Sequence, residues 1–514
     1  MRRILLICLM LSWPGRAHAE WLEAASDHFV VYADDSEKDI VRLSGQLERY
    51  HAAMGNLTGH QPDKPSPSNR VTVYVVKSVE QVRKLHGGGV RSLGGFYIPR
   101  AGASVAIVPR VDAARGDVKQ ATLILLHEYA HHFFISASGF PMPRWLSEGA
   151  AEFFATARFE DDGSVWLGLP ANHRAAELAL APDVPVADLL DPEAYARRKP
   201  TSFDAFYGKS WLLYHYLTFD DRRKGQLARY VALMAEGRKS RDAAREVFGD
   251  LAKLEKDVDA YVRKPRILSF KLAAARLPIG PVAIRRLPPG EAEMMPVRTR
   301  SRRGVDEAQA KALVSEARGI AARFPREGAV LAALAEAEYD AGNDREAIAA
   351  ADAALALDPA QTNAYVQKGF ALFRQARDAP DPVKAYAAAR APFVALNRRE
   401  NDHPLPLIFY YRSFVEQGRA PPPLALDGLA KAAQLAPFDL GLRMSLATQQ
   451  LRSGNRQGAR ANLAPVAYDP HGGPLAAVAQ RLLARLDDDP AWNGIDGLED
   501  LMAGVGATAA GEGA

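Results

Sequence analysis

The sequence predicts an α+β domain followed by an all-α domain of helical repeats. Strand-like and helical stretches mix in the first third of the chain, proline and arginine gather after residue 262, and paired helical patterns recur after residue 305. At 514 residues the chain is long for one domain, so two or three are expected. We expect a signal peptide at 1–19, the α+β domain at 20–262, a linker or small extended module at 263–304, repeats at 305–495 and a flexible tail at 496–514.

The first 19 residues have the pattern of a secretory signal peptide. Arg2 and Arg3 precede an apolar run at 4–11, and Ala17-His18-Ala19 is a small-x-small cleavage site. Eight apolar residues are too few to span a bilayer as a stable helix, so no stable membrane insertion is expected. The pattern predicts a bacterial protein that is periplasmic or secreted.

The mature chain is expected to lack cysteine and to be nearly neutral. Its one cysteine, Cys8, lies inside the signal segment, which leaves no disulfide, thiol nucleophile or cysteine ligand after cleavage. Cleavage also removes three of the 65 basic groups and none of the 61 acidic ones, which leaves a net charge of +1. This balance argues against nucleic acid as the main partner. The basic run at 300–303 is interpreted as a solvated linker.

The α+β prediction rests on alternating patterns along the chain. Residues 28–32 and 71–76 are rich in β-branched and aromatic side chains and predict strands. A helical pattern at about 37–54 lies between them. Further helices are predicted at 210–217 and 226–235.

His127-Glu128-Tyr129-Ala130-His131 is an H-E-x-x-H motif within a helical pattern that follows Asp117, an N-cap residue type. Residues four apart lie on nearly one face of a helix, so His127 and His131 can reach one metal ion. Glu128 can then face a water bound to that ion. This pattern is a known zinc metalloprotease signature. His132 lies about 100° around the helix from His131 and is expected to be a neighbour of the site.

A second helix is predicted from about Arg144, after Gly139 and Pro141 interrupt the first. It contains the segment W-L-S-E-G-A-A-E, in which Glu148 and Glu152 lie four residues apart and share a face. Two antiparallel helices joined by a short turn can bring that face to the histidines. A catalytic zinc site needs three protein ligands and one open position, and either carboxylate satisfies this geometry.

These segments resemble the gluzincin metallopeptidases, the clan of thermolysin-like and aminopeptidase N-like enzymes. Residues 145–152 are similar to the W-L-N-E-G-F-A segment that supplies the third zinc ligand, and residues 206–210 (F-Y-G-K-S) are similar to P-Y-E-K-G. The resemblance covers roughly residues 25–260 and is closest to bacterial peptidase MA-like domains. It implies a zincin-like fold for the α+β domain.

The resemblance also implies a role for each motif residue. His127, His131 and Glu148 would bind Zn²⁺, and Glu128 would be the general base. Tyr207 would stabilise the oxyanion of the tetrahedral intermediate, although a buried core tyrosine is the alternative. Glu152 would orient a ligand histidine through its second ring nitrogen.

One departure from the family bears on the substrate. The aminopeptidase N-like enzymes carry an upstream G-x-M-E-N segment whose glutamate holds the substrate's free amine. The corresponding stretch here, 94–108, contains no acidic residue. This favours an endopeptidase over an aminopeptidase. The stretch could still form an edge strand that pairs with an extended substrate.

Residues 328–361 match the 34-residue, two-helix template of tetratricopeptide (TPR) repeats. The residues at the template positions are Leu331, Leu334, Ala335, Gly342, Ala347, Ala354 and Pro359. A second repeat begins near Thr362 and loses phase near Pro380, and two more close at Pro437 and Pro470. The alternative is a set of alanine-rich helical pairs. Stacked repeats form a concave surface that suits a peptide or protein segment.

Together these patterns predict a periplasmic or secreted zinc metallopeptidase with Zn²⁺ as cofactor. Its substrate would be a peptide or protein, and its TPR repeats would dock that substrate or a protein partner. Two alternatives remain. The chain could be a non-catalytic TPR scaffold with a structural or vestigial zinc site, or it could hydrolyse a bond other than a peptide bond.

Overall fold

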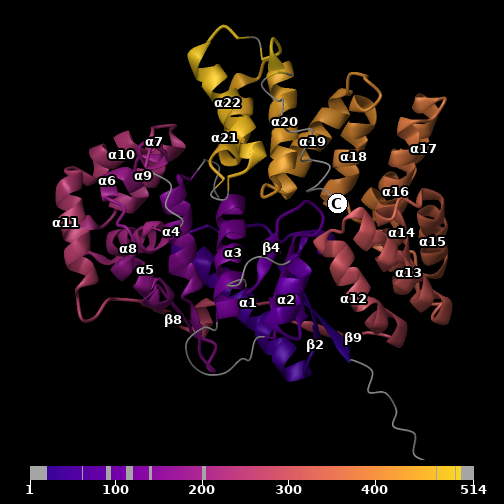
Figure 1. The fold of residues 1–514 in the computed structure, drawn as a ribbon, viewed down its shortest axis with the longest axis horizontal. Helices are drawn as coiled ribbons and strands as arrows, with labels where there is room; N and C mark the ends of the chain where they lie inside the picture. Colours follow the sequence, from indigo (N-terminus) through magenta and orange to yellow (C-terminus); the bar gives the residue numbers. More distant parts are fainter. Residues whose placement is uncertain are drawn as a thin grey trace, which may run out of the picture.

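The chain forms a mixed α/β region followed by an all-helical repeat region, as Figure 1 shows for this computed structural model. The described residues are 20–60, 62–87, 94–110, 120–137, 142–198, 204–469, 472–492, 494–498 and 500. The predicted signal peptide, Asp117, Gly139, Pro141, Pro470 and most of the predicted tail lie outside them. No helix in the described parts of the chain is long and apolar enough to cross a membrane.

A six-stranded mixed sheet lies at the centre of the α/β region, in the order β4-β5-β3-β2-β1-β9. Its strands are β1 (Trp21–Ala25), β2 (Phe29–Asp34), β3 (Val71–Val76), β4 (Phe96–Ile98), β5 (Val105–Pro109) and β9 (Ala283–Arg286). Strands β2, β3 and β5 run parallel, whereas β4, β1 and β9 each pair antiparallel with a neighbour. The strands predicted at 28–32 and 71–76 are confirmed as β2 and β3. The stretch 96–98 forms an edge strand.

Helices cover both faces of this sheet because its strands are apolar on both sides. Along β3, Val73 and Val75 join the core that includes α1 (Glu37–Thr58) and α3 (Gln120–Ala137). Tyr74 and Val76 point to the opposite core, with α2 (Val79–His86) and α12 (Pro289–Arg303). Ser36 caps α1 by accepting a hydrogen bond from the Asp39 backbone N–H. The helix predicted at 37–54 is confirmed and continues for about one more turn.

The two helices that carry the predicted metal motif pack against each other. α3 is followed by α4 (Arg144–Ala155), which also packs on α8 (Phe206–Phe219). Gly149 permits this approach, because a Cβ there would lie 2.5 Å from the backbone oxygen of Ser210. A glycine directly after Glu148 therefore sets how close α4 can come to α8.

Short helices and a second, three-stranded sheet complete this part of the chain. The sheet consists of β6 (Arg158–Phe159), β7 (Val165–Leu167) and β8 (Phe270–Leu272). The helices are α5 (Ala175–Leu180), α6 (Val186–Leu189), α7 (Pro192–Ala196), α9 (Gln226–Ala235), α10 (Ser240–Phe248) and α11 (Leu251–Val262). The 3₁₀ turns are η1 (Pro67–Asn69), η2 (Asn172–Arg174), η3 (Asp221–Arg223) and η4 (Ala274–Arg276). The predicted helix at 226–235 is α9, and that at 210–217 lies inside α8.

Residues 263–304 are part of the folded core, which differs from the predicted linker or small module. β8 joins the three-stranded sheet and β9 pairs with β1. α12 accommodates Pro296, because its Met294, Met295 and Val297 are buried in two cores and compensate for the backbone hydrogen bond that proline cannot donate. The basic run at 300–303 is its last turn, where Arg300 and Arg302 pair with glutamates of the repeat region.

The repeat region consists of consecutive helices that pack on their neighbours and follow an arc, from the right of the view in Figure 1 (α13 to α17) to the top, above the α/β region (α18 to α22). These helices are α13 (Glu307–Arg323), α14 (Gly328–Asp340), α15 (Asp344–Leu357), α16 (Thr362–Arg377), α17 (Pro382–Arg399), α18 (Pro404–Val415), α19 (Pro423–Leu435), α20 (Leu440–Arg452), α21 (Arg456–Ala467) and α22 (Pro474–Asp488). The prediction of an all-helical repeat region is confirmed.

The helix starts reproduce the predicted period and its loss of phase. The interval from the start of α14 to the start of α16 equals one predicted repeat, and so does the interval from α20 to α22. The interval from α16 to α18 is longer, in part because α17 has 18 residues where α15 has 14. Small side chains let helices approach within the first repeat, where Ala332, Ala335 and Ala351 are buried together.

The repeat region packs directly on the α/β region through the loop between α19 and α20. Asn69 donates a hydrogen bond to the backbone oxygen of Leu435 (2.6 Å), and the Asp439 carboxylate accepts one from the Ala101 N–H (2.9 Å). Ala101 and Ile135 share an apolar cluster with α18, α19 and α20. This interface adjoins the turn between β4 and β5 and the end of α3.

Candidate metal centre

Helix α3 places the two motif histidines side by side. Because His127 and His131 are four residues apart, their side chains extend from the same side of the helix. Their Nε2 atoms lie 3.1 Å apart. Both side chains are buried. In the neutral form in which histidine binds a metal, the two rings would present adjacent lone pairs to the same point.

Helix α4 adds a carboxylate to this pair. The Oε2 of Glu148 lies 3.3 Å from Nε2 of His127 and 3.4 Å from Nε2 of His131. Glu148 is fully buried, and neither of its oxygens has a well-formed hydrogen bond among the described residues. A buried carboxylate without hydrogen bonds is costly, so its environment requires a positive charge. His127, His131 and Glu148 form the one group in the described chain that could hold a metal ion.

The geometry of the group fits a tetrahedral ion. Bonds of about 2.0–2.1 Å around a tetrahedral zinc imply separations of about 3.3 Å between neighbouring ligand atoms. The three separations observed here are 3.1, 3.3 and 3.4 Å. Two nitrogens and one oxygen are donors that zinc accepts, and three ligands leave the fourth position free. The residues present therefore fit a zinc ion with one open coordination position.

The electrostatics of the group also favour a cation. Burial raises the pKa of the Glu148 carboxyl, but the two neighbouring histidines outweigh this and hold that pKa well below its usual range. Burial lowers the pKa of His127, and Glu148 and Glu152 more than reverse the effect, to about 10. The two carboxylates therefore remain charged and attract either a proton or a divalent cation.

Glu152 and Ser147 hold the outer nitrogens of the two rings. Nδ1 of His127 lies 3.3 Å from Oε1 of Glu152, and Nδ1 of His131 lies 3.1 Å from Oγ of Ser147. Such partners fix the orientation of a ligand imidazole so that its other nitrogen faces the metal. Glu152 is held in turn by His173 (2.5 Å) and by two nitrogens of Arg174 (2.5 and 3.1 Å).

Glu128 lies between the two histidines on α3 and next to the edge strand β4. Its side chain is half-buried, unlike that of Glu148. Burial raises the pKa of Tyr97 on β4, and the negative charge of Glu128 raises it further. Glu128 is thus separate from the three grouped donor atoms and close to the strand that borders the group.

Tyr207 lies at the start of α8, between two guanidinium groups. Nη2 of Arg144 is 3.4 Å from the Tyr207 hydroxyl, and the Arg174 guanidinium lies 4.7 Å from the Tyr207 ring centroid. Burial raises the pKa of Tyr207, and the charge of Glu148 raises it further, whereas Arg144 and Arg174 act to lower it. The side chain is half-buried, in contrast to a core tyrosine such as Tyr216.

Three other histidines lie near the metal group or in the core, and none of them is one of the grouped donors. His132 points away from the grouped atoms, with Nδ1 2.5 Å from the Tyr97 hydroxyl. His215 is buried between the Tyr261 hydroxyl and the Gly168 carbonyl, both 2.9 Å away. His173 reaches the group only through Glu152.

Sequence reasoning missed Ser147, Arg144 and Arg174, and it left open whether His173 lies near the site, because nothing in its spacing shows it. The four-residue spacing from Arg144 to Glu148 and Glu152 could have revealed Arg144, because the three share one face of α4. Ser147 stands inside the conspicuous W-L-S-E-G segment. His173 and Arg174 lie on the short turn η2, and no pattern in the sequence connects them with α4.

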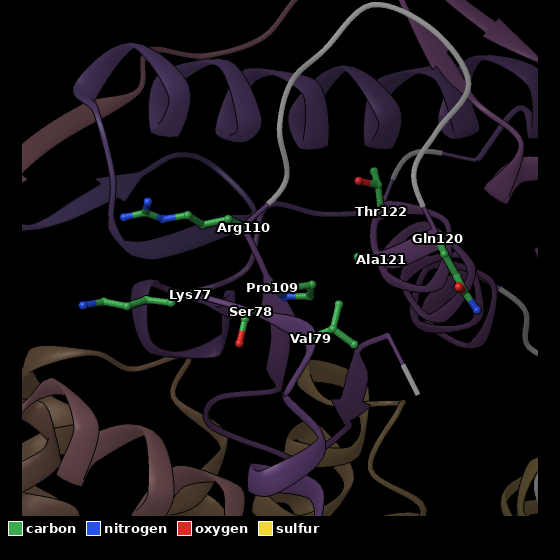
Figure 2. Close-up of a pocket in the computed structure, with 8 residues that line it drawn as sticks. All are labelled: Lys77, Ser78, Val79, Pro109, Arg110, Gln120, Ala121 and Thr122. Carbon is green, nitrogen blue, oxygen red and sulfur yellow. The ribbon is translucent and has the colours of Figure 1, made fainter. Parts of the chain in front are cut away.

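A separate cavity of about 310 Å³ lies near the carboxyl ends of β3 and β5 (Figure 2). Its lining residues are Lys77, Ser78, Val79, Pro109, Arg110, Gln120, Ala121 and Thr122. These include no histidine and no carboxylate, so the lining lacks metal-ligand side chains. Lys77 forms an ion pair with Asp34, and Arg110 forms one with Asp35.

No protein-family model matches the chain, and no curated protein matches it. Among solved structures, the chain is similar to a thermophilic TPR protein of Thermus thermophilus, with 18% sequence identity and a TM-score of 0.30. The match covers 34% of this chain and 92% of that one. The observations that characterise the two regions are the helix pairs of the repeat region and the geometry of the metal group.

Proposed function

We propose that this chain is a zinc-dependent metallopeptidase. The observation that carries the proposal is the buried group of His127, His131 and Glu148, whose donor atoms have tetrahedral spacing and whose carboxylate has no well-formed hydrogen bond among the described residues. The H-E-x-x-H and W-L-S-E-G segments that supply these residues are associated mainly with peptide hydrolysis.

When bound, zinc would act as a Lewis acid that polarises the substrate carbonyl and promotes ionisation of water. Glu128 is the proposed general base, because it adjoins both ligands yet is not one of the grouped donors. It accepts a proton from the attacking water and transfers it to the leaving nitrogen. Tyr207 is the proposed oxyanion donor, since its hydroxyl can donate a hydrogen bond and its side chain is half-buried at the start of α8, next to Arg144.

An endopeptidase is the favoured activity. Among the described strands β4 is at the edge of the sheet, beside α3, so an extended peptide backbone could pair with it. Residues 94–108 contain no carboxylate that could hold a free amine. The repeat region would dock the substrate or a protein partner, in the periplasm or outside the cell.

The test measures zinc content and hydrolysis in the mature full chain. Wild type should bind about one zinc per chain. Glu128→Gln should retain that zinc while losing most hydrolysis of a peptide library, about a hundredfold or more. Glu246→Gln, which changes an exposed glutamate on α10, is the control and should keep both. A folded wild type that takes up no zinc, or a Glu128→Gln variant as active as wild type, would refute the proposal.

The second candidate is a non-catalytic scaffold in which the repeats carry the function. The direct packing of α18, α19 and α20 on the metal-binding region makes this worth testing, because a structural metal would then stabilise the docked arrangement. This candidate requires unchanged function in a Glu128→Gln strain. It also requires zinc binding that persists while no peptide is cleaved.

A further inference from the structure

Arg144 is a cation beside the metal group that no carboxylate pairs with in the described chain. Arg174, the other guanidinium near Tyr207, is paired with Glu152 and Glu177. The polar contacts of Arg144 are instead with uncharged hydroxyls, those of Tyr207, 3.4 Å from Nη2, and of Tyr195. Its Nε is buried without a hydrogen-bond partner among the described residues. The charge of Glu148 acts on Arg144 from a distance, but in the described part of the protein no carboxylate lies within ion-pair distance of this guanidinium.

Aromatic rings hold the guanidinium in place and leave its edge for a ligand. Its central carbon lies 4.3 Å from the ring centroid of Phe206, and 5.7 and 5.8 Å from those of Tyr207 and Tyr195. Contacts of this kind cover the flat face of a guanidinium, while its N–H groups point outward in the plane. The side chain is only half-buried, so an anion can reach those N–H groups.

The position of Arg144 relates it to the reacting atoms. It precedes Glu148 by one helical turn on the same face of α4. Arg144 also contacts the hydroxyl that we propose as the oxyanion donor. A substrate group that binds here would therefore lie close to the scissile bond.

We propose that Arg144 binds a substrate carboxylate next to the scissile bond. This inference rests on the proposed peptidase function and assigns its substrates to one class, peptides that present a carboxylate at this position. The carboxylate is either a free C-terminus or an aspartate or glutamate side chain. A guanidinium binds both oxygens of a carboxylate at once, which gives affinity and orientation together.

The experiment measures dissociation constants of four peptide hydroxamates, which bind zinc through the hydroxamate. One pair differs only in a free C-terminal carboxylate against a C-terminal amide. The other pair is amidated and differs only in aspartate against asparagine. Each is titrated calorimetrically into zinc-loaded full-length wild type, Arg144→Gln and Arg144→Lys. Arg158→Gln is the control, because it removes a guanidinium that also lies over an aromatic ring, that of Trp166.

Wild type and Arg158→Gln should bind the acidic member of at least one pair about tenfold or more tighter than its amide. That pair identifies the source of the carboxylate. Arg144→Gln should lose this preference yet bind the amides as wild type does, which shows that the variant is folded and zinc-loaded. Arg144→Lys should retain part of the preference, since lysine keeps the charge without the paired N–H groups.

Equal binding of acid and amide by wild type in both pairs would overturn the inference and leave the peptidase proposal intact. A preference that persists in Arg144→Gln would also overturn it. Zinc-loaded wild type that binds none of the four hydroxamates would contradict the peptidase site, and the inference with it.

Discussion

Phe438 of the repeat region packs on the imidazole of His132, with ring centroids 4.3 Å apart. His132 directly follows the proposed ligand His131 on α3, and its Nδ1 lies 2.5 Å from the hydroxyl of Tyr97 on β4. One side chain of the repeat region thus contacts a residue that joins the motif helix to the edge strand. The repeats are in direct contact with the elements that border the metal group.

We expect Phe438→Ala to destabilise the protein by about 3 kcal/mol, because it removes a buried ring. It should also raise the rate of amide hydrogen exchange in residues 96–98, since His132 loses the packing that holds it against Tyr97. Hydrogen-exchange mass spectrometry and urea denaturation measure the two effects.

Phe393→Ala is the matched control for this prediction. Phe393 is also buried, but its cluster lies within the repeat region and does not include His132. It should reduce stability by a similar amount and leave exchange in β4 unchanged. Equal exchange in β4 for both variants would show that the contact does not support the strand.

The carboxylate of Glu152 should strengthen zinc binding without itself binding the ion. Glu152→Gln removes the negative charge that faces Nδ1 of His127, and we expect zinc affinity to fall about 10- to 100-fold. Ser147→Ala should have a smaller effect, because its hydroxyl is uncharged. Glu148→Ala should abolish stoichiometric binding. Competition with a chromogenic chelator measures all three.

Glu177→Gln is the control for Glu152→Gln. Glu177 also pairs with Arg174, but its other contact is the backbone N–H of Gly208. Zinc affinity should therefore be close to that of wild type. If the two glutamine variants weakened zinc binding equally, the effect would come from Arg174 and not from the orientation of His127.

Gly149→Ala should distort the metal group even though residue 149 contacts no ligand atom. A Cβ there would meet the Ser210 backbone oxygen at 2.5 Å, so α4 must move away from α8 and carry Glu148 with it. We expect a loss of about 1–3 kcal/mol together with weaker zinc binding.

The matched substitution is Gly319→Ala in α13, where a Cβ would meet nothing within 4 Å. It should raise stability by about 0.5–1 kcal/mol, because alanine loses less entropy than glycine in a helix. Thermal unfolding of both variants measures the two changes in stability. A Gly149→Ala protein as stable as wild type would contradict the steric argument.

Asp340 should make stability depend on pH at the contact between α12 and α14. Burial, followed by the charge of Glu336, raises the pKa of Asp340 from 3.8 to about 7, while Ser301, Arg302 and Arg100 act to lower it. The folded state therefore binds the proton more tightly than the unfolded state. The stabilisation that protonated Asp340 gives the folded state is complete below about pH 4 and disappears as the pH rises through about 7.

Asp340→Asn removes this titration. The free energy of unfolding of wild type, relative to that of Asp340→Asn, should fall between about pH 4 and about pH 7. Urea denaturation at several pH values measures the difference. A constant difference over this interval would mean that Asp340 titrates normally in the folded protein.

Local patterns predicted those helices and strands in which the apolar residues of the pattern are also the buried ones. The strand at 71–76 and the helix at 226–235 have the predicted bounds, because each combines a clear period with flanking turn residues. The histidine pair could be predicted for the same reason, since its spacing is confined to one helix. Glu148 was predicted as the third ligand from the family resemblance, because spacing alone left Glu152 as an alternative. His173 and Arg174 could not, because only tertiary folding brings η2 to α4.

The prediction failed where pairing is long-range. Strand β9, of sequence A-I-R-R, has the composition of a basic linker. Its Arg285 lies directly opposite Glu23 of β1 and also pairs with Glu291. Cross-strand ion pairing thus accommodates a charged sequence at the edge of a sheet, and no local sequence pattern predicts this pairing.

The pairing of β1 with β9 determines how much of the chain must be present before this sheet can be completed. Ala24 is opposite Ile284, so the sheet under α3 cannot be complete until the chain as far as β9 has reached the compartment where it folds. Contacts between such distant residues form slowly, because a long loop must close first. Until then the outer edge of β1 is free to associate with another chain. A fragment that ends at residue 262 keeps that edge permanently open, so we expect the smallest independent metal-binding unit to extend at least through β9.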